Sequence, residues 1–400
     1  MTLIAARLDR IKPSPSSMAG QRARELRNAG RDIISLTAGE PDFDTPENVC
    51  EAVVRAMRES KTKYTDVGGT PELKAAIQAK FRKDNGLEYA GSELIVGAGG
   101  KQIIFNALMC TVDHGDEVIV PTPFWVSYPD IVLLADGKPV FVPCPPENGF
   151  KLLPEDIERA ITPRTRWLIL NSPNNPSGAV YTHQEMKALT DVLIRHPHVW
   201  VMTDDIYEHI LYDGRKFVTP AQVEPALKDR TLTVNGVSKA YAMTGWRIGY
   251  GGGPATLIKA MVKLQSQSTS NPSSVGQAAA LEALSGPQHF IEERKNIFQT
   301  RRDIVVAELN RIAGVRCHVP EGAFYAFASC ADIIGKKTPS GRTLNTDEDF
   351  VMHLLEAQNL AILQGAAYGV SPFFRISFAT SIEKIKEGCR RLKNACEALT

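Results

Sequence analysis

Short, continuous apolar runs alternate with helical stretches through the middle of the chain. The runs lack the strict apolar–polar alternation of a strand that has one solvent-exposed face. This absence of alternation is typical of parallel strands that are covered on both faces. The pattern predicts buried strands at residues 93–98, 117–121, 138–143, 166–170, 199–203, 231–235 and 247–252. Helices are predicted between them at residues 101–110, 154–161 and 183–196. This alternation indicates an α/β fold with a mostly parallel sheet.

The pattern changes after about residue 290. A long charged helix over residues 291–312 is followed by short strands and two more helices. A Gly-Pro pair at positions 286 and 287 marks the change. We therefore predict a large domain over residues 46–288. A smaller α+β domain would combine residues 289–400 with residues 1–45.

Composition excludes several classes of protein. The 400 residues include 46 Lys plus Arg and 45 Asp plus Glu, so bulk charge points to neither nucleic acid nor an anionic membrane. The 7 cysteines include no CxxC pair, which disfavours a zinc or redox site and favours free thiols in a reducing compartment. The apolar start is broken at Arg7, and no apolar run reaches the roughly 18 residues of a membrane span. We expect a cytoplasmic protein without a metal.

Lys239 stands in the chain's most unusual cluster, residues 233–250. It lies in a turn of small residues just past a predicted core strand, and Arg247 follows it. The carboxyl ends of core strands are where open α/β sheets bind ligands. Partial burial would lower the pKa of the amine, and a neutral amine can attack a carbonyl to form a Schiff base. The alternative is a solvated structural lysine.

Polar residues follow two other predicted strands. Asp204 ends one of them, and a buried carboxylate needs a cationic partner such as a protonated ring nitrogen. Tyr207 and Asn175 could reach a phenolate oxygen on the same ring. The alternatives are a capping aspartate, a packed tyrosine and ordinary Asx-turn chemistry.

A glycine-rich segment at residues 97–108 joins a strand to a helix. Exposed N–H groups at a helix N-terminus bind phosphate well. A Walker A motif is excluded because Ile95 and Gln102 occupy two of its required positions, and Gln102 also breaks a dinucleotide GxGxxG motif. The loop therefore suits a monophosphate. Trp125, beyond the next strand, could stack on a flat ring or belong to the core.

Six motifs together resemble those of the fold-type-I enzymes that use pyridoxal 5′-phosphate (PLP). More closely, the chain resembles a class-I aminotransferase of the aspartate aminotransferase family, in its bacterial 1b subgroup. The motifs occupy residues 38–46, 63–77, 171–178, 204–209, 238–250 and 373–379. The resemblance implies a large domain with a mostly parallel seven-stranded sheet, a smaller α+β domain, and a homodimer with shared active sites.

The resemblance also implies roles for the candidate residues. Lys239 would hold PLP through its amine and, once released by the substrate, move the substrate proton. Asp204 would pair with the pyridine N–H, while Tyr207 and Asn175 would bind the ring oxygen and Trp125 would stack on the ring. The phosphate and substrate sites would be formed by the remaining members of the set: Gly99, Gly100, Lys101 and Arg247 for the phosphate, Tyr64 for the phosphate of the neighbouring subunit, and Gly39 and Arg375 for the substrate α-carboxylate.

The chain departs from the family pattern at three places. Gly236 stands where many relatives carry a serine that binds the phosphate, and Ser238 is a candidate to replace it. Residues 362–369 depart from the usual segment that lines the approach to Arg375. Pro15 interrupts the usual N-terminal pattern next to Lys12, the candidate residue for prephenate use.

The predicted reaction is ping-pong transamination between L-aspartate and 2-oxoglutarate, giving oxaloacetate and L-glutamate. The resemblance assigns the second carboxylate of these substrates to Lys101. The alternatives are an aspartate/prephenate enzyme, or an aminotransferase for aromatic amino acids, alanine or methionine. A PLP-binding transcription regulator is disfavoured because only about 37 residues precede the first motif. A binding protein without PLP would leave the joint motifs unexplained.

Overall fold

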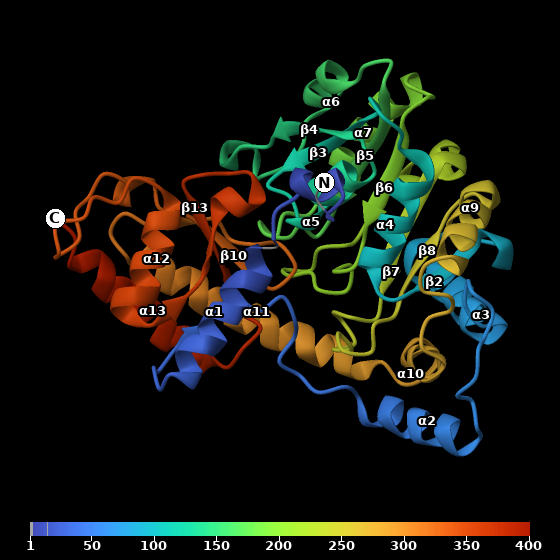
Figure 1. Ribbon diagram of the computed structural model, residues 1–400, viewed down its shortest axis with the longest axis horizontal. Helices are drawn as coiled ribbons and strands as arrows, with labels where there is room; N and C mark the ends of the chain where they lie inside the picture. Colours follow the sequence, from blue (N-terminus) through green and yellow to red (C-terminus); the bar gives the residue numbers. More distant parts are fainter. Residues whose placement is uncertain (1–2, 14) are drawn as a thin grey trace.

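A seven-stranded sheet forms the centre of the computed structural model, which describes residues 3–13 and 15–400 without the side chains of residues 15–17 (Figure 1). Its order is β2-β8-β7-β6-β5-β3-β4. Each strand coincides with one of the predicted apolar runs, which confirms the predicted sheet. The bounds are β2 Leu94–Gly97, β3 Glu117–Thr122, β4 Lys138–Pro143, β5 Thr165–Asn171, β6 Trp200–Asp204, β7 Thr231–Gly236 and β8 Gly249–Gly252.

Strand β8 differs from the others in direction. It pairs antiparallel with both β2 and β7, whereas β3, β4, β5, β6 and β7 pair in parallel. A parallel return would need a crossover of a dozen or more residues, usually helical. Residues 237–248 instead form turns, so the chain folds directly back beside β7. These turns carry Lys239 and Arg247.

Both faces of the large sheet are apolar and covered by helices. Val118 and Val120 of β3 pack with α4 Gly100–Thr111 on one face. Ile119, between them, packs on the other face with α7 His183–Arg195. Alternate side chains of a strand point to opposite faces, so this division explains why the run lacks polar positions. Edge strand β4 is the exception, and its Phe141 is exposed.

A second, four-stranded antiparallel sheet lies beside the first (Figure 1). Its order is β12-β13-β10-β9, and α11, α12 and α13 enclose a shared apolar core with it. The N-terminal part joins this region, because β1 pairs with β11. The domain boundary at residues 288 and 289 stays a prediction. The bounds are β1 Ile34–Ser35, β9 Arg316–Cys317, β10 Tyr325–Ser329, β11 Leu360–Ala361, β12 Leu363–Gln364, β13 Phe373–Ser377, α11 His289–Asn310, α12 Asp347–Gln358 and α13 Ile382–Glu397.

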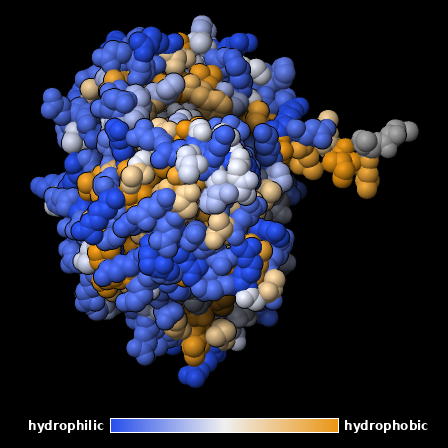
Figure 2. Space-filling model, turned by 90° about the vertical axis from the view of Figure 1, so that its left-hand side faces the viewer, coloured by the Kyte–Doolittle hydropathy of each residue, from blue (hydrophilic) through white to orange (hydrophobic). Residues whose placement is uncertain are grey.

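The other helices cover the sheets and connect them. None of the helices in the described chain is long and apolar enough to cross a membrane. Figure 2 shows the N-terminal arm projecting from a largely hydrophilic body, and the arm's Leu3 is 98% exposed. The remaining helices are α1 Pro15–Asn28, α2 Glu47–Arg58, α3 Pro71–Lys80, α5 Ser127–Leu134, α6 Pro154–Ala160, α8 Pro220–Val223, α9 Ala255–Ser266 and α10 Ser274–Ser285. The short helical turns are η1 Ala6–Arg10, η2 Phe81–Asn85, η3 Gly91–Glu93, η4 Pro146–Asn148, η5 Pro225–Arg230, η6 Ala331–Ile333 and η7 Gly365–Tyr368.

Candidate active site

A cavity of about 300 Å³ opens where β5, β6 and β7 end and where β10 and β13 of the second sheet approach them. Its position at the carboxyl ends of parallel strands is the one expected for a ligand site in an α/β sheet. It brings together most of the residues singled out by the sequence. Those that line it are Gly39, Gly100, Lys101, Trp125, Asn175, Asp204, Tyr207, Ser238, Lys239, Arg247 and Arg375.

The Lys239 amine lies inside this cavity. Its Nζ donates a hydrogen bond of 2.6 Å to the carbonyl oxygen of Gly39 and lies 5.9 Å from the centre of the Tyr207 ring. Burial lowers the pKa of Lys239 to about 8, although the negative charge of Asp204 opposes the shift. Close to half of the amine is therefore neutral near pH 8, which is the form that attacks a carbonyl.

Asp204 presents a buried carboxylate from the end of β6. It accepts a 2.7 Å hydrogen bond from the hydroxyl of Tyr128. Burial raises the pKa of Asp204, and the Tyr128 hydrogen bond acts against that rise. No ion pair to Asp204 exists within residues 3–13 and 15–400, so the carboxylate remains available to a cationic ligand group.

Tyr128 is a site residue that the sequence reasoning missed. It lies in the first turn of α5, three residues after Trp125, and the two rings meet edge-to-face at 5.2 Å. The available signal was its place close behind Trp125 and the end of a predicted core strand, where open α/β sheets bind ligands.

Arg375 forms the opposite wall from strand β13. It is 2% exposed and donates hydrogen bonds to Asn175 Oδ1 at 3.0 Å and to the Thr37 carbonyl at 2.8 Å. Its Nε has no hydrogen-bond partner in the described part of the chain, and no carboxylate there pairs with it. A buried guanidinium with an open donor favours an anion, and a planar carboxylate matches its geometry.

The glycine-rich loop meets Arg247 at the start of α4. Gly99 caps this helix with φ of +91°, and the first N–H groups of an α-helix have no partner within the helix. A Cβ on Gly99 would lie 2.5 Å from Arg247 Nη2, so the residue must stay small. Arg247 also donates to the Ala98 carbonyl at 3.1 Å. Helix N–H groups and a guanidinium thus converge, as an anionic phosphate requires.

The comparisons with known proteins agree with this geometry. Residues 31–392 match the family of class I and II aminotransferases. The chain belongs to this family. It is 57% identical over 398 residues to a probable aspartate/prephenate aminotransferase of Rhizobium leguminosarum bv. phaseoli, covering 100% of both chains.

Two solved structures show the same fold as this aminotransferase. The aspartate aminotransferase of Rhizobium meliloti superimposes with a TM-score of 0.97 at 56% identity, covering 100% of both chains. That of Thermus thermophilus with maleate gives 0.92 at 42% identity, covering 99% of this chain and 100% of the other. The predicted fold type I is confirmed.

Gly236 has a structural reason in this aminotransferase. A Cβ at this position would lie 3.0 Å from both Gly249 Cα and the Ile248 carbonyl oxygen. The direct return of β8 beside β7 brings the two backbones this close. A serine there would require its neighbours to move by a few tenths of an ångström, so the close approach of the two strands favours glycine at this position.

Lys101 lies at the outer side of the cavity. Its Nζ is 4.8 Å from the centre of the Trp125 ring, and burial together with the charge of Arg247 lowers its pKa. Lys12 does not line the cavity. It approaches Asp130, whose carboxylate accepts from the Lys12 backbone N–H and belongs with Lys101 to an adjacent cavity of about 470 Å³.

Two further predictions have different outcomes in the aminotransferase. Tyr64 is 91% exposed and lines a separate cavity, so this chain does not bring it to Lys239. The departure at residues 362–369 places the ring of Tyr368 at 5.2 Å from the Arg375 guanidinium. The side chain of Pro15 lies outside the described part.

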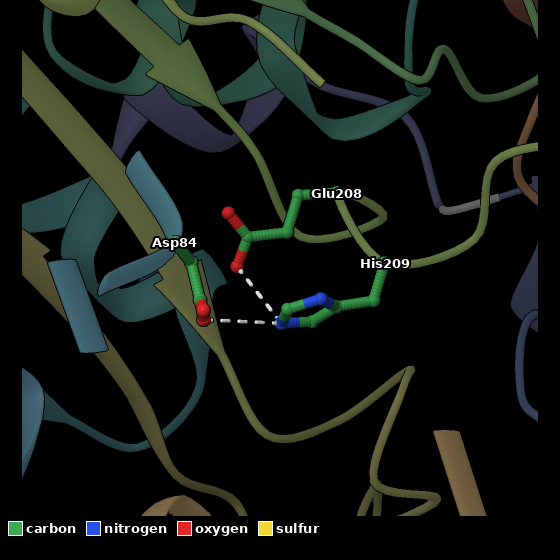
Figure 3. Close-up of side chains that lie close together, drawn as sticks. All are labelled: Asp84, Glu208 and His209. Atoms are coloured by element: carbon green, nitrogen blue, oxygen red, sulfur yellow. Dashed lines mark ion pairs between the residues drawn. The ribbon is translucent and has the colours of Figure 1, made fainter. Parts of the chain in front are cut away.

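Asp84, Glu208 and His209 form a second polar cluster, shown in Figure 3. These are residue types that bind metals, but the ammonium of Lys80 already pairs with Glu208. Burial alone would raise the pKa of Glu208, and the charges of Lys80 and His209 outweigh it and lower the pKa. Asn235 of β7 also donates to Glu208 at 2.8 Å. The cluster therefore anchors the segment that follows Asp204 at the end of β6 and carries Tyr207.

Proposed function

We propose that this aminotransferase transfers the amino group of L-aspartate to 2-oxoglutarate by a ping-pong reaction. The observation that carries the proposal is the placement of two cationic groups, Arg375 and Lys101, in one cavity with the Lys239 amine. A dicarboxylate substrate needs two such cations. The names of the relatives support this choice, and maleate in the Thermus thermophilus structure is itself a dicarboxylate.

The cavity fits PLP, the cofactor on which class I and II aminotransferases depend. The unpaired carboxylate of Asp204 suits a protonated ring nitrogen. The N-terminus of α4 beside Arg247 suits the phosphate. The face of Trp125 suits the ring, and the hydroxyl of Tyr207 with the amide of Asn175 suits its phenolic oxygen. Ser238 lines the same cavity and is the candidate for the hydroxyl contact that Gly236 lacks.

In the proposed reaction, different residues of the chain have different roles. PLP, when bound, withdraws electrons from the carbon that carries the amino group. Asp204 would keep the ring nitrogen protonated, since its carboxylate stabilises a positive charge there. Arg375 would orient the substrate by its α-carboxylate, with the backbone of Gly39 closing beside it. Lys239 Nζ would then take the α-proton from the substrate and hold it for its later return.

The active unit in this proposal is a cytoplasmic homodimer. Tyr64 is exposed and remote from the Lys239 cavity, which suits a role at the phosphate site of a second copy. Helix α2, which precedes Tyr64 in the chain, also exposes the apolar side chains of Val54 and Met57. The projecting N-terminal arm offers further apolar surface for the same partner.

Two half-reactions, followed by absorbance, test the proposal. The PLP-loaded protein should lose its visible band when mixed with L-aspartate alone, and it should regain the band when 2-oxoglutarate is added. The protein should also yield oxaloacetate in the first step and L-glutamate in the second. A protein that takes up no PLP, or whose visible absorbance does not change when L-aspartate is added, would contradict the proposal.

The lowered pKa of Lys239 predicts how PLP uptake depends on pH. With a pKa of about 8, the neutral fraction of the amine rises steeply through that pH. We expect the rate constant for PLP uptake by the cofactor-free protein to rise about tenfold between about pH 7 and pH 9 and then to level off. Stopped-flow absorbance measures this rate. A rate that continues to climb beyond about pH 10 would indicate an unperturbed lysine instead.

Lys101→Ser tests the assignment of the second carboxylate. Loss of one charge-assisted hydrogen bond of about 1.5–3 kcal/mol should raise the KM for L-aspartate by about tenfold to a hundredfold. The KM for L-alanine, which has no second carboxylate, should change by less than about twofold. The backbone N–H of residue 101 is retained, so the phosphate contact is unaffected. Equal losses for the two donors would show that Lys101 has no such role.

Prephenate is the second candidate substrate. The relative from Rhizobium leguminosarum bv. phaseoli carries it in its name. The position of Lys12 beside Asp130, at the cavity next to Lys101, offers a further cation near the entrance. The use of prephenate as the amino acceptor in the second half-reaction tests this second substrate. Lys12→Ala should lower the rate with prephenate more than the rate with 2-oxoglutarate.

A further inference from the structure

Tyr325 is a buried residue of β10 that touches both sides of the active site. Its hydroxyl lies 2.8 Å from the hydroxyl of Tyr207. The centre of its ring lies 4.4 Å from the guanidinium of Arg375. It therefore contacts one residue assigned to the cofactor and one assigned to the substrate, and it lines the cavity between them.

The direction of the hydrogen bond between the two hydroxyls matters. A tyrosine hydroxyl has one hydrogen to donate and can accept at its oxygen. If Tyr207 donated to Tyr325, it would have no hydrogen left for a ligand oxygen. Among the described residues, Tyr207 is the one hydrogen-bond partner of the Tyr325 hydroxyl. Tyr325 thus has no other acceptor for its own hydrogen among the described residues. Donation to Tyr207 satisfies both hydroxyls once a ligand oxygen accepts from Tyr207.

We propose that Tyr325 is a positioning residue that donates to Tyr207 and so directs the Tyr207 hydrogen toward the phenolic oxygen of bound PLP. The inference rests on the proposed PLP-dependent function. Its ring has a separate task, because the aromatic face supports the guanidinium of Arg375. The hydroxyl acts on the cofactor side, and the ring acts on the substrate side.

The consequence is a measurable property of the bound cofactor. A hydroxyl that itself accepts a hydrogen bond becomes a stronger donor, because successive hydrogen bonds polarise one another. A stronger donor stabilises the anionic form of the oxygen that it faces. Tyr325 should therefore lower the pH at which the absorbance of the bound cofactor changes.

The test is a double-mutant cycle with Tyr325→Phe, Tyr207→Phe and the double variant, each loaded with PLP. Spectrophotometric titration gives the pH midpoint of the cofactor absorbance. Tyr325→Phe should raise the midpoint by about half a pH unit, and Tyr207→Phe should raise it more. The double variant should match Tyr207→Phe alone, because Tyr325 acts through Tyr207.

Tyr325→Leu separates the two tasks of the side chain. The Phe variant keeps the ring beside Arg375, so its KM for L-aspartate should stay within about twofold of the wild type, whereas the Leu variant should raise it about fivefold. An unchanged midpoint in Tyr325→Phe, an equal shift in the Tyr207→Phe background, or a Tyr325→Phe protein that does not fold would overturn the proposal. A wild-type protein that binds no PLP would instead overturn the proposed function.

Discussion

Lys239→Ala should lose transamination almost completely, with kcat/KM for L-aspartate falling by about four orders of magnitude or more. In the proposed mechanism, the variant removes both the amine that would hold the cofactor and the base that would move the substrate proton. Lys101 also lines the cavity, but its Nζ lies over the Trp125 ring, 4.8 Å from the ring centre, so we do not expect it to replace Lys239. Oxaloacetate formation in the presence of 2-oxoglutarate measures the activity.

The control for this experiment is Lys263→Ala, which removes an exposed lysine of α9. It should keep wild-type activity and the wild-type visible absorbance. Lys239→Ala should bind PLP without the wild-type band. A Lys239→Ala protein that keeps more than about one per cent of the activity would show that the chemistry uses another amine.

Arg375→Lys should reduce kcat/KM for L-aspartate by about a thousandfold although it preserves the positive charge. An ammonium cannot reproduce the planar fork that binds a carboxylate through two parallel hydrogen bonds. It also cannot keep the bonds to both Asn175 and the Thr37 carbonyl that hold the guanidinium in place. Steady-state kinetics with both L-aspartate and L-alanine measure the loss.

In Arg375→Lys, kcat/KM should fall for both L-aspartate and L-alanine, because both donors carry an α-carboxylate. This outcome distinguishes Arg375 from Lys101, whose replacement should affect L-aspartate selectively. The dissociation constant of PLP should change by no more than a few-fold, since Arg375 faces the substrate side of the cavity. A variant that binds PLP poorly yet keeps its kcat/KM when saturated with the cofactor would contradict the assignment.

Local patterns predicted the strands because burial on both faces leaves a continuous apolar run. They could not predict that β8 runs antiparallel, since this depends on the turns of residues 237–248 replacing a crossover helix. Chain neighbours likewise gave no sign that β8 would return closely enough to leave little room for a side chain at Gly236.

The candidate site was predictable where a residue follows a strand or starts a helix, as Lys239, Asp204 and Gly99 do. Tyr325 was missed because its importance comes from contacts with Tyr207 and Arg375 across large separations in the chain. Its own neighbours are ordinary apolar residues of a buried strand. For Tyr64 the sequence predicted a role that a single chain cannot test, since this role needs a second copy of the chain.

The ratio of kcat/KM for L-aspartate to that for L-phenylalanine tests the central claim most directly. Each donor is measured with the PLP-loaded wild-type protein and with 2-oxoglutarate as the acceptor. The second carboxylate of aspartate should gain about 1.5–3 kcal/mol from Lys101, so the ratio should exceed about ten. A ratio of one or below would contradict a cavity built for dicarboxylates and would favour an aromatic aminotransferase.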